Sequence, residues 1–200
     1  MITYIFVIIV SYLFGSIPFG IIAAKRKGVD LRSVGSGNIG ATNVLRNVGK
    51  ISALIVLLSD GFKGAGPVLV CQYFQMSIGY QIAAALASIT GHIFSLYLKF
   101  KGGKGVATGL GTVLALSPLA GLISLGLWLF TAFLSRYSSL AALVTFLLLP
   151  LVLLSINEPR EKIIFAATAA LMITLRHKDN IKRLLNGSES KIGKKGHVHS

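Results

Sequence analysis

The segment Phe100-Lys-Gly-Gly-Lys-Gly-Val-Ala-Thr108 decides the fold, because it separates two apolar runs that are too long for a soluble domain. Its glycines lie among Lys101, Lys104 and the preceding Lys99, at a predicted membrane surface. A glycine-rich turn that leads into a helix leaves backbone N–H groups free to point at an anion, and the helix dipole favours negative charge there. The segment therefore predicts a phosphate-binding loop at the surface of a membrane protein.

A simpler interpretation of the same segment is a basic turn of the kind that flanks membrane spans on the inner side. Lys99 and Lys101 fit that interpretation well. Lys104 fits it poorly, because the glycines on both sides of it permit close approach of the backbone to a ligand. The spacing of a Walker A phosphate-binding loop is absent.

Composition supports the membrane assignment independently. Hydrophobic residues make up 54% of the 200 residues and charged residues only 13%, about half the share in a typical soluble domain. The net charge of +14 is gathered in short basic clusters between long uncharged runs. This pattern is typical of a polytopic helical membrane protein, whose partner is the lipid bilayer. It argues against nucleic acid as a partner, because the basic residues do not follow one amphipathic face.

We predict an all-α fold with seven transmembrane helices. The fourth is short and rich in glycine, and at about 1.5 Å per residue it reaches only about 20 Å, less than the ~30 Å hydrocarbon core. Whether it crosses the whole bilayer is left open. In the second helix, Asp60 and Lys63 are expected to form a buried ion pair, and Gly64-Ala-Gly-Pro67 to break the helix. The predicted helices are residues 2–24, 51–73, 79–98, 105–117, 118–135, 138–156 and 161–175.

The distribution of basic residues predicts the orientation. With the N-terminus outside and the C-terminus inside, every lysine and arginine lies on the inner side except Lys63, Arg160 and Lys162. The polar, glycine-rich loops, and with them any active site, then face the cytoplasm. Residues 1–185 form a single integral-membrane domain in this prediction. Residues 186–200 lack apolar periodicity and are predicted to be a mobile basic cytoplasmic tail.

A second polar segment, Gly35-Ser-Gly-Asn-Ile-Gly-Ala-Thr-Asn-Val-Leu-Arg46, lies in the first inner loop. Ser36 or Asn38 is expected to cap a short helix that starts near Ile39. Arginine suits bidentate binding of phosphate. A capped loop helix with a solvated basic face, without any ligand, would have the same sequence pattern. The face of that helix that can donate hydrogen bonds carries Asn43, Arg46 and Lys50.

Further polar residues gather near the last two inner surfaces. Arg136-Tyr-Ser-Ser139 lies at a predicted helix–helix turn, and His177 and Asn180 share a helix face where the last span ends. His92 lies within the third span, where an ionisable group usually faces the bundle interior. For either histidine, a purely structural hydrogen bond is the simpler interpretation.

Several kinds of catalytic machinery are missing from the sequence. It has no Gly-x-Ser-x-Gly elbow, and its six acidic residues are too dispersed to hold a catalytic metal. We therefore predict neither a metal nor a cofactor. The implied site consists of lysine, arginine, serine, asparagine and backbone amides, which bind anions and offer little general-base chemistry.

Together these segments resemble the bacterial acyl-phosphate:glycerol-3-phosphate acyltransferase family, PlsY. The resemblance runs from the first span to Glu189. A proline often follows Phe94 in the family, and Ser95 stands there in this chain. The matching motifs are Gly35–Asn43 with Arg46; Gly91-His-Ile-Phe94 with Phe100–Thr108; and Arg136–Ser139 with His177-x-x-Asn180-Ile-x-Arg-Leu-x-x-Gly187-x-Glu189.

The resemblance implies a seven-helix enzyme of the bacterial inner membrane that takes acyl phosphate and glycerol 3-phosphate as substrates. It acylates the 1-hydroxyl and releases phosphate and lysophosphatidic acid. Because acyl phosphate is already activated, such an enzyme can work by positioning and charge stabilisation, without a covalent intermediate. The acyl-chain preference and the oligomeric state are left open, and a monomer is compatible with the sequence.

The resemblance also assigns roles to residues of this chain. Lys104 would neutralise the leaving phosphate or the carbonyl oxygen, while Thr108 closes the same motif. The proton of the attacking hydroxyl goes either to His177 or to the substrate's own phosphate, whose second pKa is about 6, and we expect the phosphate to take it. Phosphate would be cradled by Gly102, Gly103 and Gly105, glycerol 3-phosphate held by Ser36, Arg46, His177 and Asn180, and the site lined by Asn38, Thr42 and Ser139.

Two other classes of function remain open from the residues alone. An anion transporter would have a similar basic vestibule, but its site would lie near the bilayer midplane rather than at one face. A scaffold could hold anionic lipids through its basic loops without catalysing a reaction.

Overall fold

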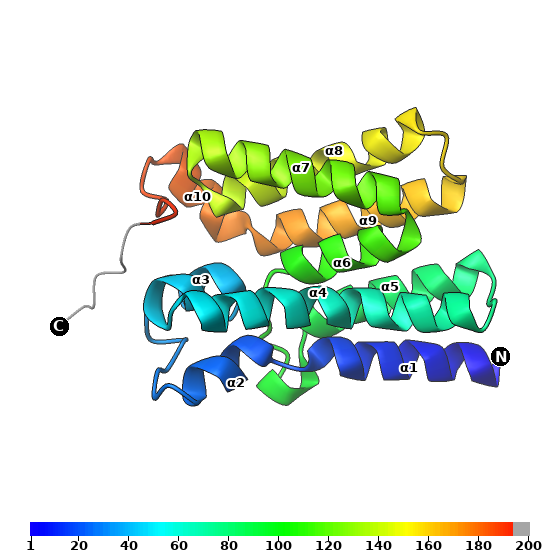
Figure 1. Cartoon of the computed structure of the whole chain (residues 1–200), viewed down its shortest axis with the longest axis horizontal. Helices are drawn as coiled ribbons and strands as arrows, with labels where there is room; N and C mark the ends of the chain where they lie inside the picture. Colours follow the sequence, from blue (N-terminus) through cyan, green and yellow to red (C-terminus); the bar gives the residue numbers. More distant parts are fainter. Residues whose placement is uncertain (194–200) are drawn as a thin grey trace.

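Each predicted span contains an α-helix in the structure, a computed structural model that describes residues 1–193. Within these residues the chain is helical and has no strand, and most of the helices lie along one common direction (Figure 1). Three short helices, α2, α3 and α10, lie at one end. The elements are α1 (Ile2–Ser16), α2 (Phe19–Lys25), α3 (Ala41–Asn47), α4 (Lys50–Tyr73), α5 (Ile78–Ile93), the 3-10 turn η1 (Leu96–Leu98), α6 (Val106–Leu116), α7 (Pro118–Ser135), α8 (Ser138–Ser155), α9 (Arg160–Arg176) and α10 (Lys178–Leu185).

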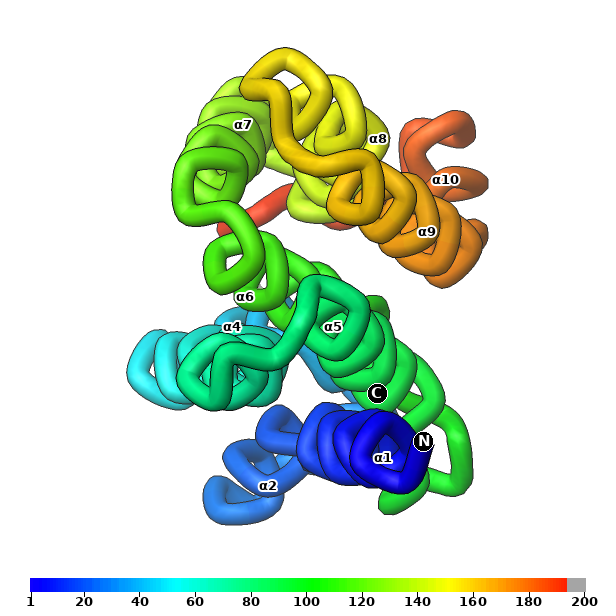
Figure 2. Tube along the Cα trace, turned by 90° about the vertical axis from the view of Figure 1, so that its right-hand side faces the viewer, coloured from blue at the N-terminus to red at the C-terminus, as the bar shows by residue number. Residues whose placement is uncertain are grey.

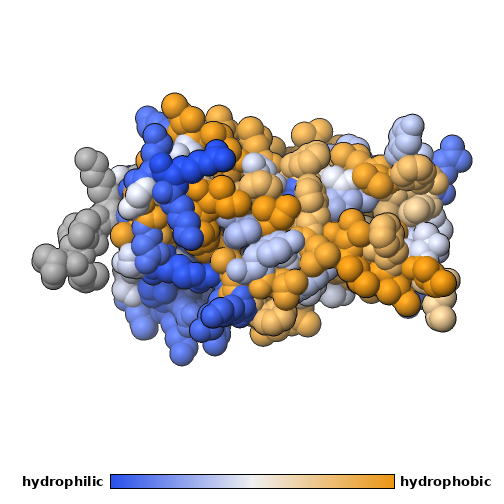
Figure 3. Space-filling model, turned by 90° about the horizontal axis from the view of Figure 1, so that it is seen from below, coloured by the Kyte–Doolittle hydropathy of each residue, from blue (hydrophilic) through white to orange (hydrophobic). Residues whose placement is uncertain are grey.

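Five helical segments are long and apolar enough to cross a membrane. Helix α6, with 11 residues, and α9, with 17, are shorter than these segments, so the count of seven complete spans stays a prediction. The orientation of the spans in the membrane also stays a prediction. Hydrophilic residues gather at the end that carries α2, α3 and α10, and apolar residues cover most of the remaining surface in this view (Figure 3). The five segments are Ile2–Lys25, Lys50–Tyr73, Ile78–Leu98, Pro118–Ser135 and Ser138–Ser155.

The helices form two groups with α6 between them (Figure 2). One group contains α1, α4 and α5, and the other contains α7, α8 and α9. Helices α4 and α6 approach closely through small residues: a Cβ on Gly111 would overlap the backbone carbonyl of Gly61. The main core joins both groups through α6 and includes Val68, Ile89, Val113, Phe146, Phe165 and Ile173.

The predicted ion pair in the second span is confirmed. Lys63 Nζ lies 2.9 Å from Asp60 Oδ1, and both side chains are buried. The first predicted span breaks before Pro18, and Lys63 Nζ also donates to the carbonyl of Ile17 at that break, at 2.8 Å. Lys63 thus satisfies a backbone acceptor near the end of α1. The break predicted at Pro67 is wrong, because α4 continues through this residue.

Candidate active site

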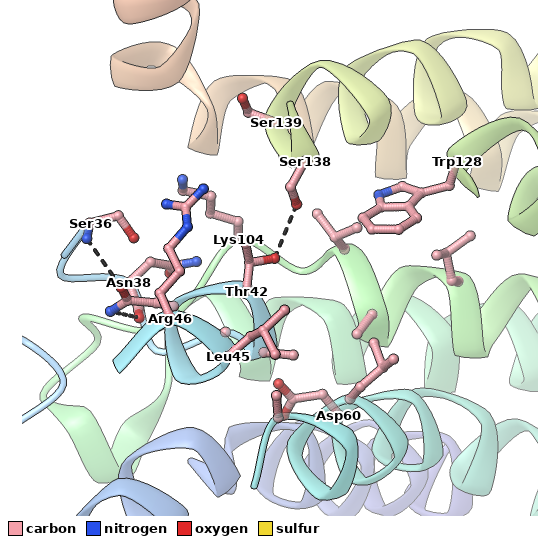
Figure 4. Close-up of a pocket in the computed structure, with 18 of the residues that line it drawn as sticks. Ser36, Asn38, Thr42, Leu45, Arg46, Asp60, Lys104, Trp128, Ser138 and Ser139 are labelled. Carbon is pink, nitrogen blue, oxygen red and sulfur yellow. Dashed lines mark hydrogen bonds between the residues drawn. The ribbon is translucent and has the colours of Figure 1, made fainter. Parts of the chain in front are cut away.

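A cavity of about 400 Å³ opens at the hydrophilic end of the molecule, between α3, α4, α6, α7 and α8 (Figure 4). One part of its wall is polar and the other is apolar. The polar part contains most of the site residues predicted from the sequence: Ser36, Asn38, Thr42, Arg46, Lys104, Ser139, His177 and Asn180, together with Lys50, Ser138 and Glu189. The apolar part contains Leu45, Leu54, Leu57, Val106, Leu110, Leu125, Trp128 and Leu129.

Lys104 lies in the loop before α6, and its side chain is partly buried. Its Nζ donates a hydrogen bond to Asn180 Oδ1. Burial lowers the pKa of Lys104 to about 8, and the carboxylate of Glu189 partly opposes that shift. The amine therefore carries most of its positive charge at neutral pH, in surroundings where a charge acts more strongly than on a solvated loop.

Glu189 organises the polar wall, a role that the sequence did not reveal. Ser139 Oγ and Asn180 Nδ2 each donate to its Oε1 at 2.7 Å, and Arg183 Nε donates to Oε2 at 2.7 Å. Burial raises the pKa of Glu189, but these hydrogen bonds and the charge of Arg183 lower it by more. The net pKa lies below its ordinary value, so the carboxylate is an anion at neutral pH. The only signal for this role was the position of Glu189 at the end of a motif.

The guanidinium of Arg46 enters the pocket from α3. Its Nη2 donates to the carbonyls of Ser190 at 2.8 Å and Lys191 at 3.2 Å. Its buried Nε has no hydrogen-bond partner within residues 1–193. Arg46 therefore joins α3 to the C-terminal segment and retains a donor for a ligand.

The same contacts bear on the predicted C-terminal tail. Residues 186–200 were expected to be mobile, yet Glu189 and the carbonyls of Ser190 and Lys191 bond to the helical part of the chain. Ile192 N also donates to the Arg136 carbonyl at 2.7 Å. The first part of the tail thus belongs to the site, and the prediction for residues 194–200 lies outside the described residues.

The short helix of the first inner loop differs from its prediction. Helix α3 ends at Asn47, so Lys50 begins α4 instead of sharing a face with Arg46. The residue before α3 is Gly40, and no side chain caps this helix. Asn43 is buried and holds the loop by donating to the carbonyls of Leu31, Val34 and Asn38 at 2.9 to 3.2 Å, while its Oδ1 accepts from Ser36 N.

His177 lies between α9 and α10 and lines the pocket. Its Nδ1 donates to the Ile173 carbonyl at 2.8 Å. Burial lowers the pKa of His177 to about 4, so the ring is neutral at neutral pH. With the proton on Nδ1, the other ring nitrogen, Nε2, is a hydrogen-bond acceptor.

Gly102 and Gly103 of the lysine loop, residues 99–105, do not form the predicted phosphate cradle. The N–H of Gly102 donates to the Ile93 carbonyl and that of Gly103 to the His92 carbonyl, each at 3.0 Å, and neither glycine lines the pocket. Thr108 is buried, and its hydroxyl pairs with His92 Nδ1 at 3.1 Å. These three residues thus hold the loop in place instead of facing a ligand.

The pocket wall nearest to this loop is the start of α6. Gly105, at φ +84°, precedes the helix, and its N–H and those of the next two residues have no hydrogen-bond partner within residues 1–193. Lys104, Gly105, Val106 and Ala107 all line the pocket. An anion would therefore meet the free N–H groups at the first turn of α6, beside the Lys104 amine.

The apolar part of the pocket is a groove formed by α4, α6 and α7. Leu54 and Leu129 line it and are also exposed on the surface that a bilayer would cover, so the groove opens sideways. Trp128 closes one wall, and its buried Nε1 has no partner within residues 1–193. Nearer the polar end, the hydroxyls of Thr42 and Ser138 pair at 3.1 Å between α3 and α8 (Figure 4).

A family model, curated relatives and solved structures all relate this chain to the same family. The family model described as "Glycerol-3-phosphate acyltransferase" matches residues 5–187. Curated relatives of that name include one from Endomicrobium trichonymphae, 45% identical over 193 residues, and one from Rhodopseudomonas palustris (strain BisB5), 48% identical over 193 residues. Each alignment covers 96% of this chain and 97% of the relative.

Two crystal structures of PlsY, an integral membrane glycerol 3-phosphate acyltransferase, have the same fold. The glycerol 3-phosphate form matches with a TM-score of 0.91 at 42% identity, and the lysophosphatidic acid form with 0.89 at 41%. Each match covers 96% of both chains. This chain therefore belongs to the glycerol-3-phosphate acyltransferase family.

Proposed function

We propose that this membrane acyltransferase of lipid biosynthesis transfers a fatty acyl group from acyl phosphate to the 1-hydroxyl of glycerol 3-phosphate, releasing phosphate and lysophosphatidic acid. One observation carries the proposal: a cationic pocket continues directly into an apolar groove that opens toward the bilayer. Such a pocket suits two phosphorylated substrates, one of which has an acyl chain. The relatives named for glycerol 3-phosphate support the acceptor, and the solved lysophosphatidic acid form supports the product.

The positions of the cations support a division of labour between two anion sites. Lys104 and the first turn of α6 lie where the groove meets the polar wall, and they would bind the phosphate of the acyl donor and stabilise charge on the reacting carbonyl. Arg46, with Ser36 and Asn38, would hold the phosphate of glycerol 3-phosphate. The groove residues of α4, α6 and α7 would hold the acyl chain.

The proton of the 1-hydroxyl would go to the phosphate of glycerol 3-phosphate. The second pKa of a free phosphate monoester is about 6, and burial lowers the pKa of His177 to about 4, which favours the phosphate as the proton acceptor. His177 would hold the substrate by accepting a hydrogen bond at Nε2, either from a glycerol hydroxyl or from a protonated phosphate. Within residues 1–193 no pocket serine is hydrogen-bonded to a histidine, which favours direct transfer over a covalent acyl-enzyme.

The location of the site follows from the topology that we propose. Seven spans with the N-terminus outside place α3, α10 and the lysine loop on the cytoplasmic side of a bacterial inner membrane, where soluble glycerol 3-phosphate is available. The concentration of hydrophilic residues at this end supports the assignment (Figure 3).

A comparison of acyl donors tests the proposal. Detergent-purified protein would be mixed with glycerol 3-phosphate and, separately, with palmitoyl phosphate, palmitoyl-coenzyme A or palmitoyl carrier protein. We expect lysophosphatidic acid from the acyl phosphate and not from either thioester. Product from a thioester alone would overturn the choice of donor, and no product from any of the three would overturn the acyltransferase assignment.

A further inference from the structure

His92 lies directly beneath the loop that carries Lys104. A Cβ added to Gly103 would overlap His92 Nε2 and lie 3.1 Å from each of the two neighbouring ring carbons. The ring is buried, at 3% exposure, and belongs to the last turn of α5. Gly103 is therefore the residue at which the loop rests against the Nε2 edge of an imidazole.

The backbone of the loop follows the end of α5. The N–H groups of Gly102 and Gly103 donate to the carbonyls of Ile93 and His92. A Cβ on Gly102 would overlap the His92 backbone carbonyl instead of the ring. The two adjacent glycines thus meet different parts of one residue, Gly102 its backbone and Gly103 its side chain.

The ring also contacts the chain on the other side of Lys104. His92 Nδ1 pairs with the Thr108 hydroxyl at 3.1 Å, in the first turn of α6. Lys104 is therefore bracketed by two contacts with one imidazole, at Gly103 before it and at Thr108 after it. Two arginines also hold the loop through its backbone: Arg32 donates to the carbonyl of Lys101, and Arg176 donates to the carbonyl of Gly103.

We propose that His92 is a positioning residue that sets the place of the Lys104 amine, and that Gly103 is glycine because of the His92 ring rather than because of a phosphate. The inference rests on the proposed function, since acyl transfer is what reports on the place of Lys104. This proposal and the phosphate-binding explanation of Gly103 predict different results when residue 92 is changed. If Gly103 makes room for a phosphate, the size of residue 92 is irrelevant to the effect of an added methyl group.

A double-mutant cycle between Gly103→Ala and His92→Asn tests the proposal. Asparagine keeps a polar atom close to the position of Nδ1, so the contact with Thr108 can persist, and it removes Nε2 and Cε1 from beneath Gly103. We expect Gly103→Ala alone to lower kcat/KM about 100-fold, the scale of a 1 Å misplacement. In the His92→Asn background the same change should cost no more than about threefold, because the overlap is gone.

Gly102→Ala is the matched control. Its added methyl group meets backbone, which no change of the His92 side chain removes. We expect Gly102→Ala to be damaging in both backgrounds. His92→Ala, which also loses the Thr108 contact, should be less active than His92→Asn.

Acetylation of lysine amines by acetic anhydride, which releases acetate and is measured by mass spectrometry, provides a readout that does not depend on activity. Gly103→Ala should raise the modification of Lys104 relative to Lys101, and adding His92→Asn should bring it back toward the wild-type ratio. An equal loss of kcat/KM from Gly103→Ala in both backgrounds would overturn the proposal. If the wild type lacks transferase activity, the proposed function fails separately, and the Lys104 modification ratio alone decides on His92.

Discussion

Lys104 Nζ donates a hydrogen bond to Asn180 Oδ1, which joins the loop before α6 to the first turn of α10. Asn180 in turn donates to Glu189, which accepts from Ser139 on α8. The amine is therefore held by a chain of polar contacts that crosses the pocket between segments far apart in the sequence. This arrangement places one partly buried positive charge where the cationic wall meets the apolar groove.

Removing this charge should abolish most activity. We expect Lys104→Ala to lower kcat about 100-fold or more, the usual effect of losing a group that stabilises transition-state charge. Lys101→Ala is the control, because Lys101 is exposed and does not line the pocket. It should change kcat little, and equal, modest losses in both variants would favour a simple basic surface turn.

The lowered pKa of Lys104 predicts loss of activity in mild alkali. A lysine is charged below its pKa, so the charge is present at pH 7 and is lost as the pH rises through about 8. The pH profile of kcat/KM reports groups of the free enzyme and should fall with a pKa of about 8. In Lys104→Arg, any activity that remains should persist to higher pH, because arginine stays charged. A flat wild-type profile across this range would contradict the assignment.

His177 should act mainly on substrate binding. Its ring is neutral and offers an acceptor to the pocket, so His177→Gln or His177→Asn should chiefly raise KM for glycerol 3-phosphate. Steady-state kinetics with varied glycerol 3-phosphate would measure the effect. A variant that binds the substrate normally but loses about a thousandfold in kcat would make His177 the general base instead.

Trp128 should influence the use of the acyl chain. It lines the groove together with Leu125 and Leu129, so Trp128→Ala should raise KM for palmitoyl phosphate and leave KM for glycerol 3-phosphate nearly unchanged. Phe130→Ala is the control, since Phe130 is an exposed aromatic residue of the same helix that does not line the pocket. Equal effects of the two changes would argue against acyl binding in this groove.

The topology predicts one-sided labelling. In a Cys71→Ser background, cysteine introduced at Lys50, Lys101 or Ser200 should react with a membrane-impermeant maleimide only from the cytoplasmic side. Inside-out vesicles would provide the positive control. Labelling of any of these positions in intact cells would reverse the orientation and remove the site from the cytoplasm.

The parts of the molecule that were predicted correctly depend on local patterns. Long apolar runs determine where the main helices lie, and residues three apart on one helix, such as Asp60 and Lys63, must be neighbours. Lys104, Arg46, His177 and Asn180 were singled out from separate loops, and all four line one pocket. Their convergence was expected only from the shared membrane face and the family motifs.

The parts that were missed depend on contacts between distant segments. The sequence cannot show that the Gly102 and Gly103 N–H groups are already bonded to the end of α5, because turn geometry alone leaves them free. The role of Glu189 also arises from long-range partners, Ser139 above all, inside a segment too polar to be predicted as ordered. Helix α3 also ends early, at Asn47, because Gly49, at φ +132°, turns the chain into α4.

A single-turnover assay of phosphate release tests the central claim, direct transfer between two bound substrates, most directly. Enzyme in excess over palmitoyl phosphate would be followed for phosphate and lysophosphatidic acid, with and without glycerol 3-phosphate. We expect both products to appear in equal amounts and at the same rate when glycerol 3-phosphate is present, and no phosphate burst when it is absent. Rapid release of phosphate without glycerol 3-phosphate, accompanied by acylated protein, would contradict direct transfer.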